Sequence, residues 1–71
     1  MTLRKAMRTL QKDAEFLGMG FTRYLGTVAS NPGIFPQGVL EAYDVFASHS
    51  KEEQTEEYAA NLGLDLSKEA V

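Results

Sequence analysis

One apolar stripe runs through the first part of the chain at alternating steps of three and four residues. Its members are Leu3, Met7, Leu10, Ala14, Leu17, Phe21, Tyr24 and Val28. A period near 3.5, sustained over almost four heptads, is typical of a helix with one buried face. Asn31-Pro32-Gly33 ends the pattern, because the residue before a proline avoids the helical region. The spacing therefore predicts a first helix over residues 2–30, with Thr2 as a suitable cap.

Three glycines, Gly18, Gly20 and Gly26, interrupt this predicted helix, and each costs up to about 1 kcal/mol relative to alanine. One alternative is a break at residues 18–20 that gives two shorter helices. The other is that the glycines serve packing, since small side chains recur every four residues and form a shallow groove for a neighbouring backbone. This row consists of Ala14, Gly18, Thr22, Gly26 and Ser30. Its regular spacing favours the continuous helix.

Two shorter helices are predicted after the Pro-Gly turn. The second helix begins at Pro36, a residue favoured in a first turn, and ends near residues 48–50. Ser50 and Glu53 then form a capping-box pattern that begins a third helix over residues 51–62. Gly63 is well placed to end that helix in a left-handed conformation. The apolar stripe of the third helix consists of Thr55, Tyr58, Ala59 and Leu62.

These elements predict an all-α fold in one small domain over residues 1–71, with two shorter helices packed against the long N-terminal one. A compact chain of this size is roughly 28 Å across. The first helix of about 29 residues would be about 43 Å long, so its apolar stripe would protrude. We therefore expect a homo-oligomer, because a protruding stripe needs a cover. The residues expected at that contact are Leu3, Met7, Leu10, Gly18 and Gly26.

The charge of the chain is divided along its length, with a net value of −3. Residues 1–23 carry five cationic and two anionic side chains, whereas residues 24–71 carry two and eight. The two parts, at +3 and −6, are expected to attract each other within one chain or between subunits. An acidic chain is a poor general ligand for nucleic acid, because phosphate neutralisation drives that binding.

The sequence lacks the usual elements of an enzyme. It has no cysteine and one histidine, His49, so disulfides and thiolate metal sites are excluded. It contains no nucleophile elbow, zinc-protease, P-loop or dinucleotide motif. We expect no catalysis, no cofactor and no metal, and interpret His49 as an exposed or capping residue. Without a membrane-length apolar stretch or the h-region of a signal peptide, we also expect a soluble, cytoplasmic protein.

The remaining function is protein binding, and two features suggest where a partner would contact the chain. Ile34 and Phe35 lie between two prolines, either as a plug in the core or as an exposed anchor. Glu53, Glu56 and Glu57 form an acidic helix face that would suit a basic partner. We therefore predict a small regulator, adaptor or inhibitor of a larger protein. By association with other small proteins without site chemistry, a phage-encoded modulator of a host or defence protein is the specific hypothesis.

Two other functions stay open at this stage. The first is a regulator associated with nucleic acid, through a basic N-terminal helix face formed by Arg4, Arg8 and Lys12. Residues 55–64 also resemble the first helix and turn of a DNA-binding helix-turn-helix unit. The segment that follows, residues 67–71, is too short for a recognition helix. The second alternative is an oligomer that sequesters a small ligand at its subunit junctions.

Overall fold

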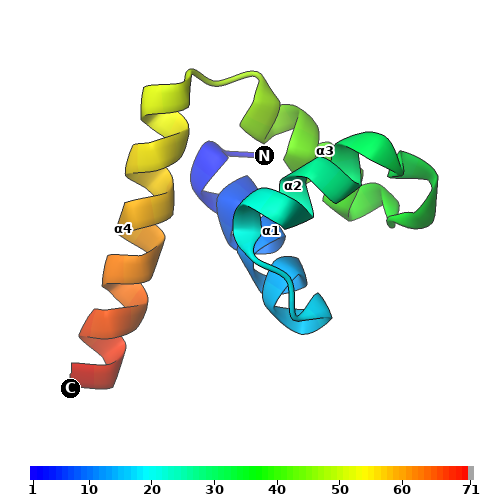
Figure 1. The fold of residues 1–71 in the computed structure, drawn as a ribbon. Helices are drawn as coiled ribbons and strands as arrows, with labels where there is room; N and C mark the ends of the chain where they lie inside the picture. The colour runs from blue at the N-terminus through cyan, green and yellow to red at the C-terminus, as the bar shows by residue number, and fades with distance from the viewer. Residues whose placement is uncertain (71) are drawn as a thin grey trace.

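Residues 1–70 form four α-helices and one short 3-10 helix (Figure 1). A computed structural model describes the backbone of residues 1–70 and the side chains of residues 1–62. The elements are α1 (Leu3–Leu17), α2 (Phe21–Ser30), the 3-10 helix η1 (Pro32–Ile34), α3 (Gln37–Ala47) and α4 (Lys51–Ala70). Within residues 1–70 there is no strand. The all-α prediction is confirmed, with four helices instead of three.

The N-terminal segment is two helices, so the prediction of one continuous helix over residues 2–30 is wrong. Thr2 caps α1 as expected, since its Oγ1 accepts a hydrogen bond from the Lys5 N–H at 3.2 Å. Gly18 ends α1 in a left-handed conformation, with φ of 69°. The Gly18 and Met19 N–H groups donate to the last carbonyls of α1, each over 3.0 Å. Glycine adopts this conformation without steric cost, so the helix ends at Gly18 although the apolar period continues beyond it.

The break allows the chain to cover most of its own apolar stripe, although Leu17 at the end of α1 is 47% exposed. The core combines the inner faces of α1, α2 and α3, and α1 packs mainly against α3. Its buried members are Ala6, Leu10, Ala14, Tyr24, Val28, Val39 and Ala42. Met7 is also completely buried, whereas Leu3 is half-buried. Because this part of the stripe is covered within the chain, Leu3, Met7 and Leu10 no longer require a second copy of the chain to cover them.

The row of small residues does not form one ridge, because α1 and α2 run in different directions after Gly18 (Figure 1). Gly26 is exposed on α2, and a Cβ added there would meet no atom within 4 Å. Gly18 likewise has open space around it. Within the chain, neither glycine permits the close approach of another helix.

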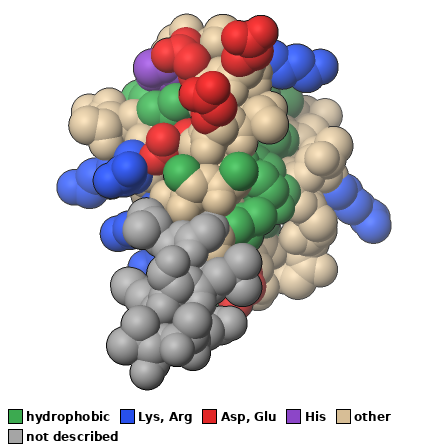
Figure 2. Space-filling model, turned by 90° about the vertical axis from the view of Figure 1, so that its left-hand side faces the viewer, with side chains coloured by type: hydrophobic (Ala, Val, Ile, Leu, Met, Phe, Trp, Pro, Cys, Tyr) green, Lys and Arg blue, Asp and Glu red, His purple; other side chains and the backbone are tan. Residues whose placement is uncertain are grey.

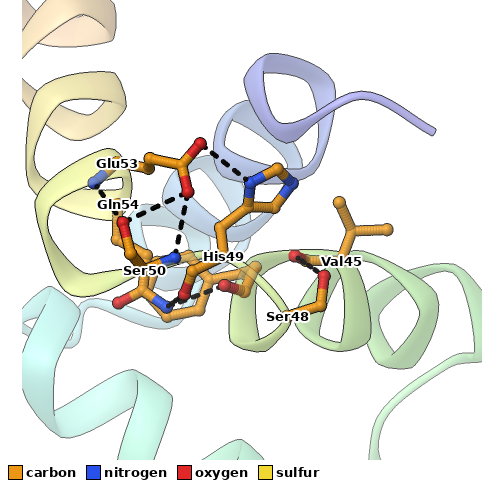
Figure 3. Close-up of polar contacts among 7 residues, drawn as sticks. Val45, Ser48, His49, Ser50, Glu53 and Gln54 are labelled. Atoms are coloured by element: carbon orange, nitrogen blue, oxygen red, sulfur yellow. Dashed lines mark hydrogen bonds and ion pairs between the residues drawn. The ribbon is translucent and has the colours of Figure 1, made fainter.

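The corner between α3 and α4 is closed by hydrogen bonds (Figure 3). The predicted capping box forms: the Ser50 N–H donates to Glu53 Oε1, and the Glu53 N–H donates to Ser50 Oγ, each at 3.2 Å. The Gln54 amide also donates to the main-chain carbonyls of Phe46, at 2.7 Å, and His49, at 3.1 Å. These contacts fix the direction in which α4 leaves α3.

Helix α4 continues through Gly63 to Ala70, so the prediction that it ends at Leu62 is wrong. Glycine lowers helix stability in an interior position but does not force a helix to end. The uninterrupted helix also lacks the turn that the helix-turn-helix resemblance requires. Its inner face is shifted from the predicted stripe: Thr55, Ala59 and Leu62 are exposed. The side chains turned inward are Gln54, Glu57, Tyr58 and Asn61.

Candidate functional site

The structure separates the two apolar residues of the loop between α2 and α3. Ile34 has 75% of its surface exposed. Phe35 is half-buried, and its ring meets the ring of the buried Tyr24 edge-on, with centroids 5.9 Å apart. Both alternatives for this loop therefore apply, each to one residue: Phe35 packs against the core, and Ile34 projects from the surface.

A shallow hollow lies beside η1, between α2 and α3, with a volume of about 350 Å³. Pro32 lines it at the turn, and Leu40 and Tyr43 line it from α3. Asp44 adds a carboxylate to the same wall. An exposed apolar side chain next to a partly apolar hollow is the kind of surface that protein partners use. We name Ile34 together with this hollow the turn surface.

The predicted acidic residues lie at the other side of the molecule, at the start of α4. In Figure 1 this segment is on the left, and the turn between α2 and α3 is on the right. Glu53 and Glu56 are exposed. Figure 2, which faces α4, shows a group of acidic side chains at the top of this face. Glu57 is half-buried and pairs with Arg4 of α1, whose Nε lies 3.2 Å from Glu57 Oε1. The predicted partner-binding residues thus do not form one continuous surface.

His49 participates in a capping arrangement (Figure 3). Its Nδ1 lies 3.5 Å from Glu53 Oε2, and Glu53 also accepts from the Ser50 hydroxyl at 3.1 Å. The Ser50 N–H, the Ser50 hydroxyl and His49 together hold the pKa of Glu53 below its ordinary value. The neighbouring Ser48 hydroxyl donates to the Val45 carbonyl at 2.8 Å. Both hydroxyls and the carboxylate are thereby used to fix the helix ends.

A larger groove, of about 440 Å³, lies between α1, the turn after it and α4. One wall is polar and comes from α1, with Arg8, Lys12 and Glu15. The other wall is apolar and includes Met19, Phe21, Tyr58 and Leu62. Figure 2, which faces α4, shows hydrophobic side chains gathered along one flank of this helix. We name this feature the α1–α4 groove.

The floor of the α1–α4 groove contains a buried amide that was not singled out from the sequence. Asn61 is 6% exposed, and its Nδ2 donates to Gln11 Oε1 at 3.1 Å. Its Oδ1 is buried without a hydrogen-bond partner among the described residues. Buried amides of this kind are normally satisfied on both atoms. The available signal was positional: Asn61 follows Gln54 and Tyr58 at helical spacing, on the side opposite the exposed glutamates.

Phe16, which is 85% exposed in the last turn of α1, was also not singled out from the sequence. It lies outside the apolar stripe, between Glu15 and Leu17, and one helical turn after Lys12. Lys12 and Glu15 both line the α1–α4 groove, whereas Phe16 is not among its lining residues. Its position off the stripe was the signal that could have identified it.

The part of the chain that the structure describes has no cluster of three or more residues able to hold a metal ion. No helix in that part is both long and apolar enough to cross a membrane. Comparisons of the chain with family models, with curated proteins and with solved structures gave no match.

Proposed function

We propose that this protein is a non-enzymatic protein-binding module that acts as a small regulator, adaptor or inhibitor of a larger protein. The observation that carries the proposal is the 75% exposure of Ile34 at a turn held in one conformation. Exposure of a large apolar side chain to water is unfavourable for the free chain. When a partner covers the side chain, the removal of that apolar surface from water favours binding.

Backbone hydrogen bonds and a ring contact constrain the turn, which favours binding. The Ile34 N–H donates to the Asn31 carbonyl and the Phe35 N–H donates to the Pro32 carbonyl, each over 3.2 Å. Phe35 holds the turn on the core through its contact with Tyr24. Little loop entropy is lost when Ile34 is covered, so more of the contact energy remains for affinity.

The hollow beside η1 offers a recess for a side chain of the partner. A projecting side chain of the partner would enter between Leu40 and Tyr43 while Ile34 enters a recess of the partner. The acidic start of α4 lies too far around the molecule to join this contact. Its charges would act at longer range, by raising the association rate of a basic partner.

The non-enzymatic part of the proposal is supported by the positions of the polar side chains. His49 and Glu53 are used in the cap of α4. The nucleic-acid alternative is disfavoured by the net charge of −3 and by the pairing of Arg4 with Glu57. The turn surface contains no cationic side chain among its described lining residues.

The test is site-specific photo-crosslinking in cells of the native source. A benzoylphenylalanine at position 34 should yield a discrete protein adduct, and the same probe at exposed Glu41 on α3 should not. Once the captured protein is purified, Ile34→Ser should weaken its binding at least about tenfold, mainly through faster dissociation. Equal binding by wild type and Ile34→Ser would overturn the proposal, provided that circular dichroism shows both to be folded.

A further inference from the structure

The hollow of the turn surface contains one charged group, the carboxylate of Asp44 on α3. The other described residues that line the hollow are all uncharged. Asp44 is exposed, and neither ion pair among the described residues includes it. The hollow therefore joins a mostly apolar wall to one carboxylate that a cation from outside the chain can reach.

The position of Asp44 within α3 also favours a cation. Asp44 lies in the last turn of the helix, which ends at Ala47, and that turn contains no basic side chain. The macrodipole places partial negative charge at this end of a helix, so an anionic side chain is unfavourable there and a cation is favourable. A cation bound to the carboxylate would offset this unfavourable interaction in the free chain.

The wall next to Asp44 suits the aliphatic stem of a long cationic side chain. Leu40 and Asp44 are four residues apart, so their side chains are neighbours on one face of α3. Leu40 and Tyr43 are both half-buried and line the hollow, which has a volume of about 350 Å³. Methylene groups of arginine or lysine cover apolar surface of this kind while the charged end remains at the edge.

The ring of Tyr43 favours arginine over lysine. It packs against the ring of Phe46 on the same helix, with centroids 6.3 Å apart, and Phe46 thereby supports it. A guanidinium stacks on an aromatic face and donates two parallel hydrogen bonds to a carboxylate, whereas an ammonium acts as a point charge. The sequence places Tyr43 directly before Asp44, so one arginine can use both residues.

Other occupants fit the hollow less well. An anionic side chain would be repelled by Asp44. A wholly apolar side chain would remove water from the carboxylate without replacing its hydrogen bonds, and that desolvation is costly. An arginine satisfies the carboxylate and covers the apolar wall at the same time.

We propose that this hollow is the docking site for an arginine side chain of the partner protein. The arginine stem lies between Leu40 and Tyr43, and its guanidinium pairs with Asp44. The proposal rests on the proposed function, in which Ile34 is the apolar anchor of the same contact. The two contacts differ in kind: Ile34 supplies apolar burial, whereas the charge pair selects a partner with a basic residue in register.

A nuclear magnetic resonance titration of the full chain with N-acetylarginine amide tests the site without the partner. The amide signals of Leu40, Tyr43 and Asp44 should shift in a saturable way at millimolar ligand. N-acetylcitrulline amide has nearly the same shape but no charge, and N-acetyllysine amide has the charge but no planar fork. Both should bind at least about threefold more weakly than the arginine probe.

Two variants assign the shifts to the carboxylate. Asp44→Asn should abolish them, with an unchanged fold because the side chain is exposed. Glu52→Gln is the matched control, since it removes an exposed negative charge on α4 and should leave the titration as in wild type. The absence of a saturable shift at the hollow, or equal binding of the arginine and citrulline probes, would overturn the proposal.

The captured partner supplies a second test that separates the two proposals. Asp44→Asn should weaken its binding at least about tenfold and flatten the salt dependence, and Glu52→Gln should leave its dissociation rate unchanged. If Ile34→Ser weakens binding but Asp44→Asn does not, the proposed function stands and the arginine site is overturned. If the arginine probe binds as expected but Ile34→Ser binds the partner normally, the arginine site stands and the proposed role of Ile34 is wrong.

Discussion

The two sides of α1 are covered in different ways. Towards α2 and α3, its buried residues Ala6, Leu10 and Ala14 meet apolar side chains, and we call this contact the apolar layer. Towards α4, the described polar contacts are an ion pair, Arg4 with Glu57, and an amide pair, Gln11 with Asn61. The only described residue of α4 that is fully buried is Asn61, a polar one.

This difference indicates a division of stability within a very small protein. Apolar burial contributes about 25 cal/mol per Å² of surface, whereas an exposed ion pair contributes little. The α1–α2–α3 layer therefore supplies most of the free energy of folding. The α1–α4 contact is weaker, contains the larger groove and retains surface that another molecule can cover.

The largest expected difference between the two sides comes from shortening a leucine on each. Leu10→Ala should lower the free energy of unfolding by about 2–5 kcal/mol, because it leaves a cavity in the apolar layer. Leu62→Ala, on α4 and 42% exposed, should change it by less than about 1 kcal/mol. Urea unfolding followed by circular dichroism measures both. Equal losses would mean that α4 is as well packed as the core.

The apolar layer contains one polar pair, and its removal should give the next largest change in the free energy of unfolding. The buried Tyr24 hydroxyl donates to Asp13 Oδ2 at 2.6 Å. Tyr24→Phe should cost about 1–2 kcal/mol, because the partly buried Asp13 carboxylate loses its donor. Urea unfolding of both proteins at neutral pH measures this loss, and an unchanged midpoint would show that water replaces the phenol without cost.

The same hydroxyl makes stability depend on alkaline pH. Burial, and then the hydrogen bond and charge of Asp13, raise the pKa of Tyr24 above its ordinary value of 10.0. A raised pKa in the folded state stabilises the protein fully below the unfolded value. Wild type should therefore lose stability as pH rises above about 10, towards the folded pKa. Tyr24→Phe should show a shallower loss over the same range.

Some of this contrast could be predicted from the sequence, and some could not. The apolar period located Leu10, Ala14, Tyr24 and Val28, because burial is what creates that period. The break at Gly18 depends on whether α2 packs better when it turns back, which is a tertiary effect that local spacing does not contain. The α1–α4 groove includes residues on both sides of that break, so it was not predictable from spacing alone.

The inner face of α4 could not be predicted for a related reason. Hydrophobicity placed Leu62 on the inner face and did not single out Asn61, but the direction of α4 is set by Gln54 and the capping box at its start. At the turn surface, by contrast, Pro32 and Gly33 indicated the turn directly, and the two alternatives for the residues after it covered what the structure shows. Local chemistry was predictable there because no distant contact decides it.

The stability of the apolar layer should be adjustable without touching α4. Gly26→Ala, at an exposed helical position of α2 with open space around it, should raise the free energy of unfolding by up to about 1 kcal/mol. A higher midpoint in thermal unfolding would confirm this. A lower midpoint would instead indicate that Gly26 is covered by another molecule in solution.

The smallest expected effect concerns the cap of α4 in acid. A lowered folded pKa means that Glu53 stabilises the protein above its ordinary value of 4.5, and that this contribution disappears as pH falls through the folded value. Glu53→Gln should therefore flatten the acid side of the stability profile. Glu52→Gln, outside the capping box, serves as the control. If both variants change the acid side of the profile equally, the effect comes from the loss of one negative charge and not from the capping box.

Native-state hydrogen exchange tests the division between the two sides of α1 most directly. The amides of α4 in residues 55–62 should exchange through an opening of lower free energy than those of Leu10 and Ala14 in α1, which should require global unfolding. If both sets exchange at the same free energy and with the same denaturant dependence, α4 belongs to a single cooperative core, and the proposed division of stability is contradicted.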